Sequence, residues 1–197
     1  MKKLKFILTA IAVVFSTSVF AQNLNFGLKA GLNLSSASIK VLGEKIDDTK
    51  MLLGLVVGAF ADYNLTESLG LEAGLQFEQK GYKEKVLGET LKCKLNYLTI
   101  PVNLRYNLSV GDNNLYFLAG PTFGIGVSAK YNDTSFDLGD DINRMNIGLL
   151  FGAGYELSSK LGLRVTYDLG LSNLTPDGDS DNKFKTNVLG FAVTYKF

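Results

Sequence analysis

One segment near the end of the chain alternates strictly between two kinds of side chain. From Leu161 to Ser172, apolar or aromatic residues occupy every odd position, and charged, polar or very small residues occupy every even position. The odd positions hold Leu161, Leu163, Val165, Tyr167, Leu169 and Leu171. A period of two over this length predicts a β-strand whose two faces lie in different environments.

The same alternation recurs along the rest of the chain after residue 24, and no stretch shows convincing helical periodicity. We predict eight strands, over residues 25–35, 51–63, 69–82, 94–107, 115–128, 144–157, 161–172 and 185–197. The sequence therefore predicts a single all-β domain.

The polar faces of these strands indicate which side of the sheet faces inward. They carry charged residues and most of the 21 glycines of the chain. A soluble barrel would place these residues in water, where nothing requires glycine. In a small membrane barrel, the apolar face contacts lipid and the polar face lines the lumen, which the side chains of eight strands just fill. We therefore predict an eight-stranded antiparallel up-and-down transmembrane β-barrel.

The connections between the predicted strands alternate in length. Residues 64–68, 108–114 and 158–160 form short connections, whereas residues 36–50, 83–93, 129–143 and 174–184 form long ones. Short periplasmic turns and longer external loops are typical of outer-membrane barrels, which predicts the orientation of the strands. Because the number of strands is even, both mature termini are then expected in the periplasm.

An aromatic belt is expected at the periplasmic edge, because aromatic rings favour the interface between lipid and water. Seven outward aromatic residues lie at that end of their strands. They are Phe26, Tyr63, Tyr106, Phe117, Tyr155, Tyr195 and Phe197.

The first 21 residues have the organisation of a secretory signal peptide. Three lysines within the first five residues precede an apolar stretch of 15 residues over 6–20, and cleavage is predicted between Ala21 and Gln22. The mature barrel domain then covers residues 22–197. A membrane-anchoring helix is the alternative, but such a helix needs about 20 apolar residues.

Composition argues against several classes of function. The mature chain has 17 basic and 19 acidic residues, a net charge of −2, which does not suit nucleic-acid binding. Cys93 is the single cysteine, so no internal disulfide can form. The chain has no His, which excludes a Ser-His-Asp triad, a Cys-His pair and His-based metal sites.

We expect neither an enzyme nor a cofactor. Glu72, Glu78, Glu156 and Asp168 are the inward acids that a carboxylate active site could use, but salt bridging is the role that we favour.

Seven aspartates cluster in two of the long loops. They are Asp133, Asp137, Asp140, Asp141, Asp177, Asp179 and Asp181. Clusters of carboxylate oxygens can bind hard divalent cations. However, the segment that begins at residue 177 lacks both the glycine at position six and the glutamate at position twelve of an EF-hand loop. We favour solvated loop charge and predict no metal site.

Two prolines interrupt the alternation. Pro101 and Pro121 lie inside the fourth and fifth predicted strands, where each removes a ladder hydrogen bond. A closed barrel has no free edge for them, so we predict a bulge or local irregularity where these two strands meet.

Four segments carry motifs that are similar to those of a known family. They are Tyr97-Leu98-Thr99-Ile100-Pro101-Val102, Tyr116-Phe117-Leu118-Ala119-Gly120-Pro121, Gly152-Ala153-Gly154-Tyr155-Glu156 and the closing residues 189–197. Over residues 24–197 the chain resembles the PorT-like outer-membrane β-barrel family. The resemblance implies an outer-membrane location. The name-giving member assists a protein secretion system, and the resemblance transfers no catalytic residue. The terminal Phe197 resembles the end of the signal that the barrel-assembly machinery reads.

Three functional hypotheses follow. The leading one is a non-enzymatic outer-membrane barrel that acts through its external loops or as an accessory to secretion or envelope integrity. The second is a small passive pore for solutes, which a filled lumen argues against. The third is an enzyme with a histidine-free carboxylate site. We expect a monomer that contacts outer-membrane lipid, meets the barrel-assembly machinery during biogenesis and does not bind nucleic acid. An unidentified envelope or secretion protein is a candidate partner.

Six charged residues are expected to form one network in the lumen near the periplasmic ends of six strands. They are Asp62, Glu72, Arg105, Glu156, Arg164 and Lys196. Because a buried unpaired charge is costly, three acids beside three bases predict mutual pairing and a closed plug. Glu156 and Arg164 flank a short turn, and Glu72 and Arg105 lie on adjacent strands. A selectivity ring or proton path is the rival interpretation.

We predict that the mature protein begins at Gln22 and fractionates with the outer membrane. Intact-mass spectrometry of the purified protein measures the first point. A protein that retains Met1, or that is recovered in the soluble periplasm, would contradict the prediction.

Overall fold

The computed structural model describes residues 23–41, 44–46, 50–86, 89–111, 113–132, 134–136, 138, 142–175 and 183–197. These residues form ten strands. They are β1 (Leu24–Val41), β2 (Glu44–Ile46), β3 (Lys50–Asn64), β4 (Leu69–Val86), β5 (Glu89–Val110), β6 (Asn113–Tyr131), β7 (Thr134–Phe136), β8 (Met145–Glu156), β9 (Leu161–Gly170) and β10 (Lys183–Lys196). Within the described ranges, no helix is long and apolar enough to cross a membrane.

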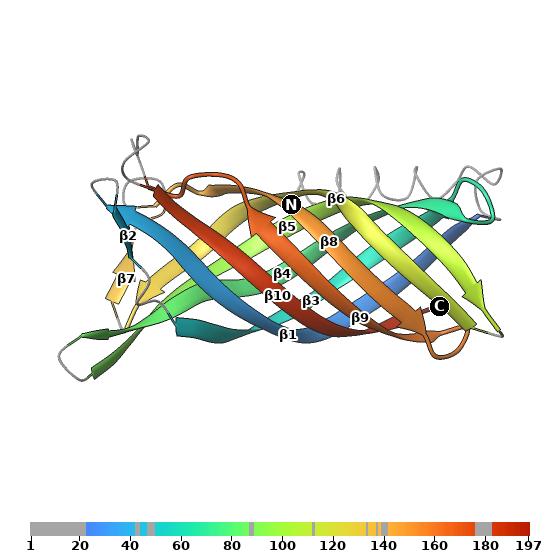
Figure 1. Ribbon diagram of the computed structural model, residues 1–197, viewed down its shortest axis with the longest axis horizontal. Helices are drawn as coiled ribbons and strands as arrows, with labels where there is room; N and C mark the ends of the chain where they lie inside the picture. The colour runs from blue at the N-terminus through green and yellow to red at the C-terminus, as the bar shows by residue number, and fades with distance from the viewer. Residues whose placement is uncertain are drawn as a thin grey trace, which may run out of the picture.

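The long strands form a closed antiparallel ring (Figure 1). The ring order is β10-β9-β8-β6-β5-β4-β3-β1, and pairing of β1 with β10 from Gly27↔Lys196 to Lys40↔Lys183 closes it. The predicted all-β antiparallel fold is therefore confirmed. The short strands β2 and β7, which pair with β1 and β6, are additional elements at the end where the long connections lie.

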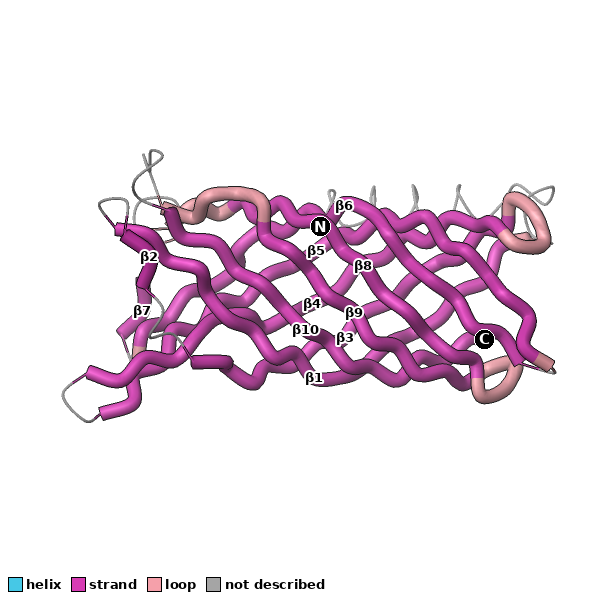
Figure 2. The backbone as a smooth tube through the Cα atoms, viewed as in Figure 1, coloured by secondary structure: helices cyan, strands magenta, loops and turns pink. Residues whose placement is uncertain are grey.

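Several strands extend further than the alternation predicted. The predicted long connection over residues 83–93 is mostly paired backbone, since β4 and β5 remain in register as far as Val86↔Glu89 (Figure 2). The hairpin of β4 and β5 projects beyond the ring (Figure 2), and there both faces of the two strands can contact water. Side-chain alternation is then no longer required, although backbone pairing continues, and this explains why the prediction was wrong.

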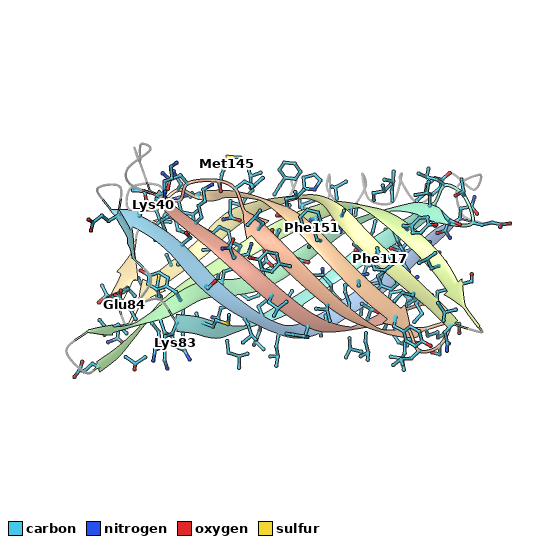
Figure 3. The ribbon with its side chains drawn as sticks, viewed as in Figure 1. Lys40, Lys83, Glu84, Phe117, Met145 and Phe151 are labelled. Carbon is cyan, nitrogen blue, oxygen red and sulfur yellow. The ribbon has the colours of Figure 1, made fainter. Side chains whose placement is uncertain are left out.

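The two faces of the ring are inverted relative to a soluble barrel. Outward apolar side chains such as Leu55 (60 % exposed) and Phe151 (48 %) cover the outside, where Figure 3 shows Phe151 and Met145. Inward polar side chains such as Glu72 (1 %) and Asn103 (1 %) are buried. The predicted placement of the polar face inside is confirmed.

Pro101 and Pro121 lie at gaps in the ladder. The β4–β5 ladder is interrupted between Ala73↔Val102 and Gln76↔Thr99, beside Pro101. The β5–β6 ladder is interrupted between Pro101↔Thr122 and Leu104↔Ala119, and its register is unchanged across the gap. The register of β5 and β6 shifts at a different place, between Asn96 and Tyr97, nearer the long-connection end. The predicted local irregularity is confirmed.

The seven predicted belt aromatics lie toward the short connections. Tyr106 and Phe117 face each other across β5 and β6 and are exposed. The rings of Tyr195 and Phe197 meet edge to face with centroids 5.8 Å apart, and the Phe197 backbone N–H donates to the carbonyl oxygen of Phe26. Tyr63 and Tyr155 are half-buried near their strand ends.

Gly120 allows β5 and β6 to approach closely beside the proline gap. A methyl group at this position would overlap the carbonyl oxygen of Val102 and lie 2.7 Å from the Cα of Asn103. We predict that Gly120→Ala lowers the free energy of unfolding by roughly 2 kcal/mol, because the new atom meets backbone rather than a flexible side chain.

Urea unfolding in detergent micelles, followed by circular dichroism, measures this effect. Gly126→Ala is the matched control, since its nearest neighbours are the flexible methyl groups of Leu138 at 3.3 and 3.4 Å. Equal stability of the two variants would contradict the close-approach explanation.

Candidate functional site

The structure brings the six predicted lumenal charges together at the short-turn end of the barrel. Each comes from a different strand of the ring: β3, β4, β5, β8, β9 and β10. They are Asp62, Glu72, Arg105, Glu156, Arg164 and Lys196, and ion pairs link all six into one network. We call this set the basal network.

Arg105 connects three acids of the basal network. Its Nη1 donates to Oδ2 of Asp62 at 3.0 Å, and its Nη2 donates to Oε1 of Glu156 at 2.6 Å. Asp62 and Glu72 face each other directly across β3 and β4, and both are almost fully buried. Two opposed carboxylates repel each other. Nη1 of Arg105 lies within ion-pair distance of both carboxylates, at 3.7 Å from Oε2 of Glu72, and so reduces this repulsion.

Arg164 binds Glu72 across the lumen. Its Nη1 and Nη2 donate to Oε1 and Oε2 of Glu72 at 2.7 and 2.6 Å, which is the bidentate geometry of a strong charge-assisted pair. β4 and β9 are not neighbours in the ring, so this bond spans the barrel. Glu156 and Arg164 lie diagonally on β8 and β9, as expected, but they form no ion pair with each other within the described residues.

Lys196 completes the basal network beside the chain end. Its Nζ lies 3.0 Å from Oδ2 of Asp62 and 2.6 Å from Oε1 of Glu156. Glu156 also accepts a hydrogen bond from Asn114 at 3.3 Å. The three acids and three bases of this network are therefore mutually neutralised.

Tyr116 holds both arginines in place, and the sequence analysis did not identify it as a network residue. Its hydroxyl accepts a hydrogen bond from Nε of Arg164 at 3.0 Å, and its ring lies 3.7 Å below the Arg105 guanidinium. A side chain at Gly154 would overlap this ring, so the glycine makes room for it. The alternation in the sequence could have identified Tyr116. Like Leu118, it occupies an even position of β6, and the even positions of this strand face inward.

A second charge network lies further along the lumen. The buried Lys80 pairs with Glu78 at 2.8 Å and with Asp168 at 3.0 Å. Thr99 donates to Glu78 at 2.6 Å, and Thr122 donates to Asp168 at 3.1 Å. We call Glu78, Lys80 and Asp168 the upper network. Lys80 was missed because the inward parity of β4 was not followed beyond Glu78.

Little space remains between the two networks. A cavity of about 20 Å³ is lined by the buried Lys29 together with Asn33, Gln76 and other inward side chains. This volume holds one or two water molecules. Counting Lys29, the interior of the described barrel contains five acids and five bases. The charges of the described interior therefore balance, and inward side chains leave a cavity of only about 20 Å³ between the two networks.

Apolar side chains pack together inside the barrel at the end with the long connections. Leu95, Tyr97 and Leu174 are fully buried there, and Phe184 packs against them. A pocket of about 380 Å³ lies above this cluster, lined mainly by Tyr82, Tyr131 and Phe184 with Cys93, Ile142, Leu174 and Thr175. Cys93 is buried and carries a free thiol.

The remaining sequence predictions fall outside the described residues. These are the signal cleavage position at Ala21 and Gln22 and all seven loop aspartates. Among the residues that the structure does describe, no three His, Cys, Asp or Glu side chains gather in a way that could hold a metal ion.

Comparison with known families agrees with this architecture. Residues 20–175 match the family described as outer membrane protein beta-barrel domain. The chain belongs to this family. A search of curated proteins found no match.

The barrel domain is similar to several solved structures. It is similar to Neisserial surface protein A, with 16 % identity, a TM-score of 0.55 and coverage of 87 % of this chain and 97 % of that one. Ail of Yersinia pestis, crystallised with the heparin analogue sucrose octasulfate, gives 19 % identity, a TM-score of 0.49 and coverage of 89 % and 99 %. OprG of Pseudomonas aeruginosa gives 18 % identity, a TM-score of 0.48 and coverage of 88 % and 95 %.

We predict that Arg164→Met destabilises the barrel domain by about 3–5 kcal/mol, because it leaves the Glu72 carboxylate buried without its bidentate partner. Thermal or urea unfolding in micelles measures the change. The double variant Glu72→Met/Arg164→Met should recover part of the loss, since it removes the stranded charge as well.

Arg144→Met is the matched control. Arg144 is exposed, and its Nε donates to the carbonyl oxygen of Leu138 rather than to an acid. If Arg164→Met unfolds like this control, the basal network does not stabilise the barrel.

Proposed function

We propose that the chain is secreted, loses residues 1–21 and inserts in the outer membrane as an eight-stranded transmembrane barrel. The family and the exposed apolar girdle support this location. We place the short turns and both mature termini in the periplasm and the long connections outside, and we expect a monomer.

We further propose that the barrel is sealed and acts through its external end, either through its loops or as an accessory to secretion or envelope integrity. The observation that carries this proposal is the interior. The neutral basal network, the upper network and the buried Lys29 occupy the lumen, and the cavity between the two networks holds one or two water molecules. A transport path needs continuous space that these side chains occupy.

The same contacts weigh against the other two hypotheses. A passive pore would require the basal network to open, although each of its members is held by at least one ion pair. The four inward acids considered for a carboxylate enzyme all bind cations: Glu72 binds Arg164, Glu156 binds Arg105, and Glu78 and Asp168 bind Lys80. Salt bridging leaves none of them available as a general acid or base.

The PorT-like resemblance favours an accessory role beside a secretion or envelope protein. Cross-linking in intact cells, followed by purification of the barrel from outer membranes, tests this role. Repeated recovery of one envelope protein would support it, and recovery of the barrel-assembly machinery alone would leave only the biogenesis contact.

We predict that the purified protein produces no steady current in planar lipid bilayers. The Arg105→Ala/Arg164→Ala variant should give small openings, because it removes both arginines that cross the basal network. A steady open channel in the unmodified protein would contradict the sealed-barrel proposal and favour the passive pore.

A further inference from the structure

The outward face of β4, β5 and β6 changes character in three steps along the barrel. Nearest the short turns it is apolar over residues 69–77 of β4, 98–106 of β5 and 117–127 of β6. A polar row follows, in which Gln79 donates to Asn96 at 3.2 Å and Asn96 donates to Ser128 at 2.8 Å. Beyond this row the outward residues are basic.

Four lysines form this basic surface, which we call the lysine patch. Lys83 and Lys92 face each other across β4 and β5, and Lys94 and Lys130 face each other across β5 and β6. Lys92 and Lys94 are two residues apart on β5, so they lie on the same face, opposite the buried Cys93. Lys92 and Lys130 are exposed, and Lys83 and Lys94 are half-exposed. Figure 3 shows Lys83 at the long-connection end of the barrel.

Direct opposition of like charges destabilises a pair of strands. The patch contains two such pairs, and Lys50 adds a third contact of this kind by facing Lys83 across β3 and β4. No carboxylate in the described part of the chain forms an ion pair with any of the four patch lysines. The described residues therefore supply no anion that offsets this repulsion.

The position of the patch indicates what that anion is. Each apolar segment of β4 and β5 spans nine residues, which matches the roughly 9–11 that a tilted strand needs to cross a bilayer. Lys94 lies four residues beyond Leu98, or about 9 Å further along the membrane normal for a strand tilted by about 45°. Lysine stems can bend back toward the bilayer, so the ammonium groups reach the headgroup layer.

We propose that the lysine patch binds the phosphate groups of anionic lipid headgroups in the leaflet at the long-connection end. This inference rests on the proposed function as an outer-membrane barrel. The patch lies on the same three strands as the apolar lipid-facing surface, one polar row beyond it, and this position favours lipid over a soluble partner. Phosphate groups between facing lysines neutralise both members of each pair.

Binding of diphosphorylated lipid A to the purified full barrel in zwitterionic micelles tests the proposal. Thermal unfolding is measured against lipid concentration for the parent, for Lys94→Glu and for Lys160→Glu. Lys160 is exposed in the short turn before β9, so Lys160→Glu makes the same charge change at the opposite end.

We expect lipid A to raise the unfolding temperature of the parent and of Lys160→Glu equally. Lys94→Glu should bind with an apparent Kd about tenfold weaker. Without lipid, Lys94→Glu should melt no lower than the parent, because an acid then faces Lys130. If Lys94→Glu fails to fold, Lys92→Gln/Lys94→Gln provides the same comparison.

Three results would overturn the inference: no lipid-dependent rise in the parent, an equal rise in Lys94→Glu, or an equal rise with free inorganic phosphate at the same phosphate concentration. Because the titration uses micelles, its outcome is independent of cellular location. A protein that fails to fractionate with the outer membrane would contradict the proposed function, whereas correct fractionation without lipid binding would contradict the lysine patch alone.

Discussion

The barrel depends on how it accommodates two carboxylates that face each other inside it. Asp62 and Glu72 are opposed across β3 and β4 and are almost completely buried, an arrangement that is unfavourable by both repulsion and desolvation. Arg105 and Arg164 make it stable, and they come from β5 and from β9 on the far side of the ring. Neutralising this pair therefore requires a closed ring, so charge compensation and barrel closure are achieved together.

The interior of this inverted barrel is largely polar and charged, with apolar side chains gathered in separate clusters, so the buried charges must stabilise one another. With the buried Lys29 counted, the acids and bases of the interior balance, and Tyr116 supplies a ring and a hydroxyl that orient both arginines. A network in which every member is paired specifies one arrangement of side chains, whereas a partly paired one would be costly. The paired side chains also occupy most of the space between the two networks. This is why we propose that the barrel acts through the surfaces at its long-connection end and along its lipid-facing wall.

Alternation in the sequence was sufficient to predict the strands, their faces and the inward orientation of the six basal charges. Alternation could not identify which residues pair across the lumen. Whether a residue occupies an odd or an even position indicates the face of the strand on which it lies, but not which distant strand lies opposite. The bond between Arg164 and Glu72 is of this kind. Alternation also failed beyond the apolar belt, where β4 and β5 stay paired although both faces can be wet. Lys80 and Tyr116, in contrast, obey the inward parity and could have been found by extending it.

The two ends of the barrel contain like charges in register, and the difference between them is informative. At the short-turn end the opposed acids point inward, and only residues of the chain itself can reach them, so the sequence supplies arginines there. At the other end the opposed lysines of β4, β5 and β6 point outward, and the described chain supplies no acid beside them. A protein in water would gain by placing acids among those lysines. If the lysine patch binds lipid phosphates as proposed, the repulsion is relieved on insertion, and these pairs would favour the inserted state.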